Sequence, residues 1–482
     1  MANNTQDGLF PGPALPVSGE PLAGLGGHKT ALALALLGAG AAALFICAHW
    51  SIAVVGAALI LVLSAVESEP FLLFIIFLSP LGWSLKTEGV LRDVPSAVRF
   101  LVVVGFFLSR LWRGRADVRR LLSSPIARAS LFFLGAITVP IIFGWTYYSA
   151  HCLWVGSYIG FFFLVSAWAD SPERVRKILR VLLYSTIITA VFAVLQEIVG
   201  GYTSFWLYLN PPGDNFQEWR GRATSFLGSD NTLAAYLNLV LPFALACYLL
   251  GRSKWKKLGG WTFGLGLVAL LSTQSIGGTL AFVSILVLAI FCFAETGKKR
   301  LVLLAALCGL ACLFYLLRPV LNPSHTEQFI ESDVVSRLLL WGTAWDYFIH
   351  SPVMGVGLGN FTHLYGSDLP FLPPGALAVH NTYLQFLAET GLVGFVAFFY
   401  VVVQSWRQAR SQWRSSVDFL DSALAFGVLG ALLSVLVHGF MDFLFEAQIA
   451  ALFWVLLALL VASGRSQCKS VVGRAEVSGA QA

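Results

Sequence analysis

The sequence predicts an all-α fold, a polytopic bundle of about 12 to 14 transmembrane helices with one large outer loop that contains interfacial helices. Two observations predict it. Of the 482 residues, 57% are hydrophobic and only 12% are charged, whereas a soluble domain carries about 25% charged residues. Apolar runs long enough to cross a hydrocarbon core of roughly 30 Å also recur along the chain. Because so few charges cannot cover a watery surface, lipid must be the main solvent.

The chain divides into three predicted parts. Residues 1–29, rich in Gly and Pro, are an expected disordered cytoplasmic tail, residues 30–463 form the membrane domain, and residues 464–482 form a cytoplasmic C-terminal tail. No clear cleavage site follows Lys29, so we expect a retained span or a signal anchor there. The predicted spans are residues 30–47, 51–66, 70–83, 96–112, 126–145, 152–168, 178–200, 231–250, 261–273, 276–294, 301–317, 383–404, 422–440 and 448–463. The short N-terminal runs could merge or be re-entrant, which gives the lower span number.

The basic residues predict the orientation of the bundle. Most of the 31 Lys and Arg lie in short clusters between apolar runs, around residues 113–120, 174–180, 252–257, 298–300, 407–414 and 465–474. Such loops mark the cytoplasmic side. An even number of spans must separate the clusters at 252–257 and 298–300, and two spans that meet near Gln274 satisfy this. Both termini are then cytoplasmic, while residues 201–230 and 319–382 lie outside.

The outer loop at residues 319–382 contains a predicted helix. Its apolar residues recur at helical spacing between residues 333 and 350, and Pro352 ends the pattern; they are Val334, Leu338, Trp341, Trp345 and Phe348. Tryptophan on an apolar face is typical of a helix that lies along the membrane interface. Arg337, the only Lys or Arg of this loop, lies beside that face.

Several function classes find no support in the sequence. The net charge of +6 comes from loop clusters rather than from one basic surface, so no nucleic-acid partner is expected. The seven cysteines give no disulfide framework. The glycines at 355–359 lack the Lys and Ser or Thr of a phosphate-binding loop, no His and Cys set has metal-ligand spacing, and no serine lies in a nucleophile elbow. We therefore predict no metal and no cofactor.

A small set of polar residues on the predicted outer side could carry chemistry. Arg220 and Arg222 end the first outer loop, Arg337 lies on the interfacial helix, and His380 with Asn381 precedes the next span. Arginine binds phosphate through two parallel hydrogen bonds. Histidine can accept the proton of a hydroxyl group. Singly, an interfacial Arg more often extends to lipid headgroups and such a His more often caps a helix. Together they suit transfer from a phosphate-activated lipid to a hydroxyl acceptor.

Three sequence stretches resemble the O-antigen ligase and O-antigen polymerase superfamily of membrane glycosyltransferases. The first, HNTYLQFLAETGLVG, begins at His380 and contains Gly391 and Gly394 at the family's spacing. The others are RATSFLGSDNTLAAYL from Arg222 and SRLLLWGTAWDYFIHSPVMGVGLGNF from Ser336. The resemblance covers about residues 215–445.

The resemblance implies a metal-independent activity on the outer face of the bacterial inner membrane, where a glycan moves from undecaprenyl pyrophosphate to an acceptor hydroxyl. It implies that Arg222 and Arg337 hold the pyrophosphate, with Arg220 and Asn381 as further substrate contacts, and that His380 is the base. Where many members carry Ser-Arg-Gly, this chain has Ile276 in the middle position. A third anionic contact is therefore lost or supplied by another residue, such as Arg220.

Alternatives remain open at this stage. A ligase and a polymerase differ in the acceptor, which is the lipid A core for one and another lipid-linked glycan for the other, and protein or teichoic-type acceptors are also compatible. A transporter or flippase of lipid-linked glycans is the alternative of another class, because spans that meet near Gln274 resemble a transporter site. His438 and Asp442, four residues apart on a late span, could face each other, and we assign neither to catalysis.

Overall fold

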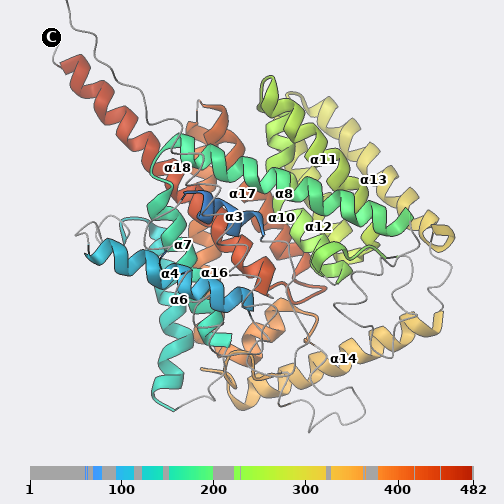
Figure 1. The fold of residues 1–482 in the computed structure, drawn as a ribbon. Helices are drawn as coiled ribbons and strands as arrows, with labels where there is room; N and C mark the ends of the chain where they lie inside the picture. Colours follow the sequence, from blue (N-terminus) through green and yellow to red (C-terminus); the bar gives the residue numbers. More distant parts are fainter. Residues whose placement is uncertain are drawn as a thin grey trace, which may run out of the picture.

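The computed structural model describes residues 60, 62, 69–78, 94–112, 122–144, 151–198, 222–227, 229–321, 327–361, 364, 378–416, 418–445 and 447–479. Within these residues the regular structure is helical, and no strand occurs. The helices pack side by side into a bundle, and α14 runs across one end of it (Figure 1). The all-α prediction is thus confirmed.

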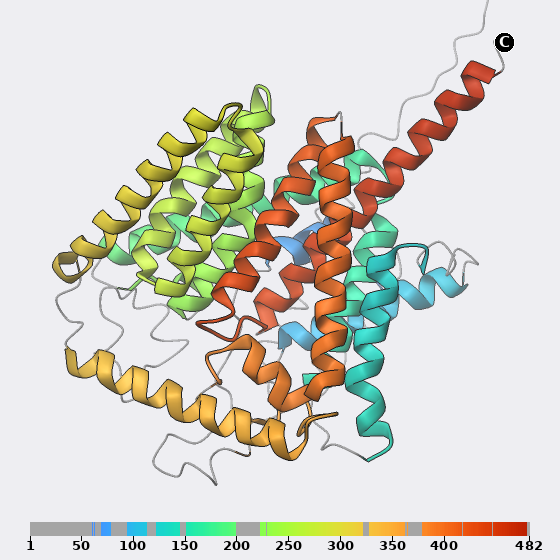
Figure 2. The same cartoon turned by 180° about the vertical axis from the view of Figure 1, so that it is seen from behind.

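The described helices follow one another along the chain in a fixed order. They are α3 (Glu69–Phe77), α4 (Val94–Trp112), α6 (Pro125–Ile142), α7 (His151–Trp168), α8 (Pro172–Ile198), η2 (Ser225–Leu227), α10 (Asp230–Leu250), α11 (Lys254–Thr273), α12 (Ile276–Phe293), α13 (Gly297–Leu321), α14 (Glu327–His350), α16 (Thr382–Ser415), α17 (Phe419–His438) and α18 (Ala447–Gly479). Figure 2 shows the C-terminal part of α18 extending away from the bundle.

Eight helices of the described part of the chain are long and apolar enough to cross a membrane, namely α6, α7, α8, α10, α12, α16, α17 and α18. The chain is a multi-pass membrane protein. The predicted spans at 261–273 and 301–317 coincide with α11 and α13, and those at 70–83 and 96–112 overlap α3 and α4. The predicted spans at 30–47 and 51–66 lie, apart from residues 60 and 62, outside the described residues.

Helix α8 begins at Pro172, six residues before the predicted start at residue 178. The apolar pattern underestimates the helix because its first turns carry charged side chains, and a helix can continue through the headgroup region without apolar residues. Lys177 forms ion pairs there with Glu69 of α3 at 2.6 Å and with Glu173 at 3.3 Å. These exposed pairs add little stability but join α3 to α8.

The centre of the bundle is built on α10, which packs against α11 and α17. Small residues let these backbones approach closely, as is common between membrane helices. A Cβ on Gly427 of α17 would lie 2.2 Å from the Phe243 ring of α10, and one on Gly259 of α11 would lie 2.6 Å from the carbonyl oxygen of Ala244. Packing here therefore depends on the absence of a side chain.

Several helices begin or end at the same end of the bundle, which we call the α14 end. Helices α10, α12 and α16 begin there, and α11 and α17 end there. The predicted junction near Gln274 is confirmed, because α11 stops at Thr273 and Gln274 takes a left-handed φ of 54°. The hydroxyl of Ser275 then caps α12 by accepting a hydrogen bond from the Gly278 amide at 3.1 Å.

Helix α14 contains the predicted helix at 333–350 and begins earlier, at Glu327. It lies crosswise to the bundle helices in both views (Figures 1 and 2). Leu340 and Ala344 are fully buried against the bundle, whereas Leu338 and Trp345 are 57% and 49% exposed. Part of the apolar pattern therefore lies on an exposed face, whereas Trp341 packs against the buried Leu340 and donates to the Val379 carbonyl at 3.0 Å.

Candidate functional site

The start of α16 fixes the position of His380. Asn381 caps this helix, and its side-chain oxygen accepts hydrogen bonds from the amides of Tyr383 and Leu384 at 3.0 and 3.1 Å. His380 itself has a φ of 51°, a left-handed conformation that costs a residue with a Cβ on the order of 1 kcal/mol or more. The cap and the turn before it therefore hold the imidazole in a defined direction.

The turn at residues 439–445, which follows α17, is hydrogen-bonded to the start of α16. The Thr382 amide donates to the carbonyl of Gly439 at 2.8 Å. The Thr382 hydroxyl donates to the carbonyl of Asp442 at 2.8 Å and accepts from the Leu444 amide at 3.1 Å. One threonine thus fastens the 439–445 turn to the residue next to the His-Asn pair.

Within this turn, the Asp442 carboxylate lies 2.9 Å from Nδ1 of His380. The side chains are 13% and 26% exposed, respectively. Burial alone would raise the pKa of Asp442, but the hydrogen bond from His380 and the nearby positive charge lower it below its usual value. An ionised Asp442 that accepts a proton from Nδ1 leaves Nε2 as the basic nitrogen of His380.

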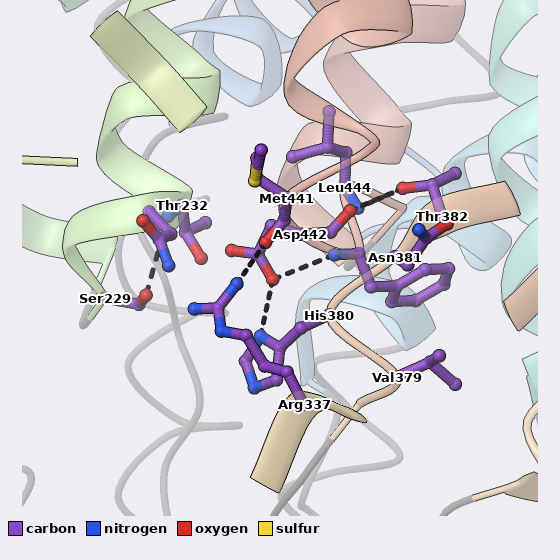
Figure 3. Close-up of polar contacts among 12 residues, drawn as sticks. Ser229, Thr232, Arg337, Val379, His380, Asn381, Thr382, Met441, Asp442 and Leu444 are labelled. Atoms are coloured by element: carbon purple, nitrogen blue, oxygen red, sulfur yellow. Dashed lines mark hydrogen bonds and ion pairs between the residues drawn. The ribbon is translucent and has the colours of Figure 1, made fainter. Parts of the chain in front are cut away.

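Arg337 approaches the same turn from α14. Its Nη1 donates to the carbonyl of Met441 at 2.6 Å. In Figure 3 the guanidinium of Arg337 and the ring of His380 both point toward Asp442. Three elements that are distant in the sequence therefore place an imidazole, its carboxylate partner and a guanidinium around one turn.

Arg222 occupies the neighbouring part of the α14 end. Its guanidinium forms an ion pair with Asp230, the first residue of α10, and its Nε donates to the carbonyl of Thr273 at 3.2 Å. The side chains of Arg222 and Asp230 are only 18% and 6% exposed. Arg222 thus links the ends of α10 and α11 through a largely buried charge pair.

The start of α12 lies against the 439–445 turn, because a Cβ on Gly277 would lie 2.9 Å from the Cβ of Met441. Figure 3 shows Ser229 and Thr232, at the start of α10, across from Arg337 and Asp442. The start of α10 is in turn joined to that of α12, because the Ser275 hydroxyl donates to the side-chain oxygen of Asn231 at 2.6 Å.

The structure explains why glycine stands at the two motif positions, Gly391 and Gly394. Gly391 interrupts α16 with a φ of 59° and a ψ of −166°, and a Cβ there would lie 2.4 Å from the carbonyl carbon of Val353. At this interruption, backbone groups of α16 are free to form hydrogen bonds with the segment at 352–357. The Leu392 amide donates to the Pro352 carbonyl and the Gly357 amide donates to the Glu389 carbonyl, both at 2.8 Å. A Cβ on Gly394 would meet the Thr390 side chain at 2.3 Å. Both glycines are therefore required by close contacts of α16.

The structure brings together some of the predicted site residues. Arg337 and His380 share the 439–445 turn. Arg222 is connected to this turn through the start of α10, which is joined to the start of α12, and α12 lies against Met441. Asn381 is accounted for as a helix cap, and its predicted substrate contact stays a prediction. Arg220 lies outside the described residues.

Sequence reasoning missed Asp442 as the partner of His380 and Asp230 as the partner of Arg222. The sequence allowed His438 and Asp442 to face each other. Helix α17 ends at His438, the Asp442 amide donates to the His438 carbonyl at 3.1 Å, and the Asp442 carboxylate pairs with His380. The ring of His438 is 1% exposed, and its Cδ2 lies 2.6 Å from where a Cβ of Gly277 would stand. One signal was available, because Asp442 is the only ionisable residue at 439–445.

Within the described residues, no group of three or more His, Cys, Asp or Glu side chains could hold a metal ion. The groups that gather at the α14 end are guanidinium, imidazole and carboxylate. Such a set can bind a phosphate and move a proton.

Comparisons with known proteins agree with the motifs. Residues 261–399 match the family described as O-Antigen ligase, and this range contains Arg337, His380 and both motif glycines. The chain is also 21% identical over 321 residues to the teichuronic acid biosynthesis protein TuaE of Bacillus subtilis (strain 168), an alignment that covers 63% of this chain and 64% of that relative. The resemblance to the O-antigen ligase and polymerase superfamily is thereby confirmed.

Proposed function

We propose that this protein is a membrane glycosyltransferase of the ligase or polymerase type, which moves a glycan from undecaprenyl pyrophosphate to a hydroxyl group of an acceptor. The observation that carries the proposal is the contact of 2.9 Å between His380 and Asp442 on the turn that also binds Arg337. A base oriented by a carboxylate, beside a guanidinium, is what this transfer needs.

In the proposed step, Asp442 accepts the Nδ1 proton of His380, and Nε2 takes the proton of the acceptor hydroxyl. The acceptor oxygen forms a bond to the anomeric carbon of the glycan while the bond from that carbon to the pyrophosphate oxygen breaks. The electron pair leaves with undecaprenyl pyrophosphate. This arrangement follows the logic of a carboxylate, histidine and hydroxyl triad, in which the carboxylate sets the tautomer and stabilises the imidazolium.

The leaving group gains negative charge as the bond breaks, and Arg337 and Arg222 would stabilise that charge. Guanidinium groups fixed in advance at a site with little water stabilise such charge more strongly than they would in bulk water. The starts of α10, α12 and α16 add the positive ends of three helix dipoles at the same end of the bundle. This would compensate for Ile276, which has no group that binds an anion.

We place the α14 end on the periplasmic side of the inner membrane, with both termini in the cytoplasm. The support is the distribution of basic residues along the helices. Lys254, Lys256 and Lys257 begin α11 and Arg414 lies in the last turn of α16, and both positions are at the opposite end of the bundle from His380. Basic residues favour the cytoplasmic side.

The acceptor distinguishes a ligase from a polymerase, and we propose the ligase activity, with lipid A core or another surface molecule as the acceptor. Deletion of the gene tests the choice through the length of the glycan on the lipid carrier. Long chains that are not attached to the surface acceptor would support a ligase, whereas single repeats on the lipid would indicate a polymerase.

Reconstitution tests the class of activity itself. Purified protein in liposomes would receive labelled lipid-linked glycan, with and without an acceptor. We expect label to move to the acceptor, and to stay on its original leaflet when no acceptor is present. Movement of the lipid-linked glycan across the bilayer without transfer would contradict the proposal and indicate a flippase.

A further inference from the structure

The ion pair between Arg222 and Asp230 is unusual for a residue proposed to bind a phosphate. Arg222 is 18% exposed, and its guanidinium is already paired with a carboxylate that is 6% exposed. A buried pair loses much of its attraction to the cost of removing two charges from water. A negative group next to a phosphate-binding arginine also opposes the binding of the phosphate.

Groups other than the Asp230 carboxylate cap α10 and hold the segment around Arg222. Ser229 is the N-cap of α10, since its side chain accepts from the Thr232 amide. The segment around Arg222 is held to α11 by two other bonds, from the Ala223 amide to the Ser272 carbonyl at 3.0 Å and from Arg222 Nε to the Thr273 carbonyl at 3.2 Å. The Asp230 carboxylate also accepts from the Asn231 amide, but an asparagine side chain can keep such a bond while it loses the charge.

The charge of Asp442 also acts on Asp230. With the donor absent, the two arginines and the two carboxylates balance each other. A bound pyrophosphate adds at least two negative charges next to both carboxylates, and Asp230 is the one that shares its guanidinium partner with the phosphate.

We propose that Asp230 is an affinity-setting counter-ion, which holds Arg222 in the empty site and competes with the pyrophosphate of the lipid donor and product for its guanidinium. The inference rests on the proposed function. Asp230 does not take part in the chemical step. It keeps the binding of undecaprenyl pyrophosphate weak enough for the product to leave and for Arg222 to return to a defined partner.

Inorganic pyrophosphate is a suitable probe, because it carries the charge of the leaving group without the lipid. Its inhibition of glycan transfer would be measured for the reconstituted wild type, Asp230→Asn, Arg222→Gln and the double variant. We expect Asp230→Asn to lower the half-inhibitory concentration on the order of 10-fold, because one competing charge is removed. Its KM for the donor should fall together with kcat as product release slows. With Arg222→Gln present, Asp230→Asn should have little further effect.

A matched control is Asp418→Asn at the start of α17, which also removes one carboxylate at a helix start but at the opposite end of the bundle. Asparagine caps helices as well as aspartate does, so this variant should keep the wild-type inhibition. Asp230→Ser serves as a second variant if Asp230→Asn folds poorly, since serine is also favoured near a helix start. A thermal melt of each variant reports folding.

The outcomes separate the inference from the proposed function. Unchanged or weaker inhibition in Asp230→Asn and Asp230→Ser, with wild-type melting and an active wild type, would overturn the role of Asp230 alone. If Asp418→Asn increased the inhibition by pyrophosphate as much as Asp230→Asn does, the role of Asp230 would also be overturned. The effect would then come from the net charge of the protein. A wild type that neither transfers glycan nor binds the lipid donor would overturn the proposed function and this inference together.

Discussion

The contact between α10 and α17 and the turn at 439–445 adjoin each other, yet they are built differently. In the contact, Gly427 and Gly430 of α17 lie against the side chains of Phe243 and Pro242, and the helices are apolar. In the turn, backbone groups and polar side chains bind α14 and α16. The first region is held by close packing and the second by directed hydrogen bonds. Substitutions in the first should change folding, and those in the second should change chemistry.

The largest effect that separates the two regions is expected for Asp442→Asn. The amide keeps the shape of the carboxylate but no longer fixes the Nδ1 proton of His380, so transfer should fall about 100-fold or more. The rate per folded molecule would be measured in liposomes. A variant that melts like the wild type and transfers at half its rate or better would show that the turn has no catalytic part.

The same residue gives a pH dependence with a defined sign. Because the folded-state pKa of Asp442 is lowered, its stabilising effect is fully present above the unfolded value of about 3.9 and is lost as the pH falls through the folded value. We expect the difference in melting temperature between wild type and Asp442→Asn to shrink as the pH falls below about 4. A difference that does not shrink there would contradict the lowered pKa.

A combined effect on folding and chemistry is expected for Gly391→Ala. The backbone there has a φ of 59°, and the new Cβ would meet the carbonyl of Val353. The cost should be about 1 to 3 kcal/mol for the strain alone. Because Gly391 follows the segment of α16 that His380 and Asn381 begin, transfer per folded molecule should also fall. A melt and a transfer assay on the same sample separate the two effects.

In the packed region, Gly427→Ala should affect folding alone. The added methyl group would overlap the Phe243 ring, and overpacking of this kind costs about 1 to 3 kcal/mol. We expect a lower melting temperature with wild-type transfer for each folded molecule. A loss of transfer without a change in melting would show that the two regions are not separate.

The smallest effect is expected for Asp418→Ala at the far end of α17. Its carboxylate accepts from the Leu420 amide at 3.2 Å as the helix cap, and loss of such a cap costs about 1 kcal/mol. Transfer per folded molecule should not change. Circular dichroism during heating would measure the cost, and a change in transfer rate would contradict a purely local role.

The two regions also differ in how well the sequence predicts them. The apolar pattern predicts the spans and the α14 helix, because burial in lipid depends on the length and spacing of apolar residues. It cannot predict the pairing of His380 with Asp442, since the partners are 62 residues apart and meet only because α17 ends at His438. The apolar pattern also does not predict the break of α16 at Gly391, because a helical pattern continues on both sides of it.

Arg222 and Asp230 show a different reason for failure. They are close in the sequence, but a short irregular segment separates them, and its direction follows from the bonds to Ser272 and Thr273 of α11. The family resemblance implied that Arg222 binds a phosphate. Only the fold shows that a carboxylate already occupies it.

The most direct test of the central claim is the transfer rate of His380→Gln in liposomes with the lipid-linked donor saturating, together with donor binding to the same preparation. The claim is that His380, oriented by Asp442, removes the proton of the acceptor hydroxyl. It predicts that donor binding is kept while the rate falls about 100-fold or more. A rate near that of the wild type, with normal donor binding, would contradict it.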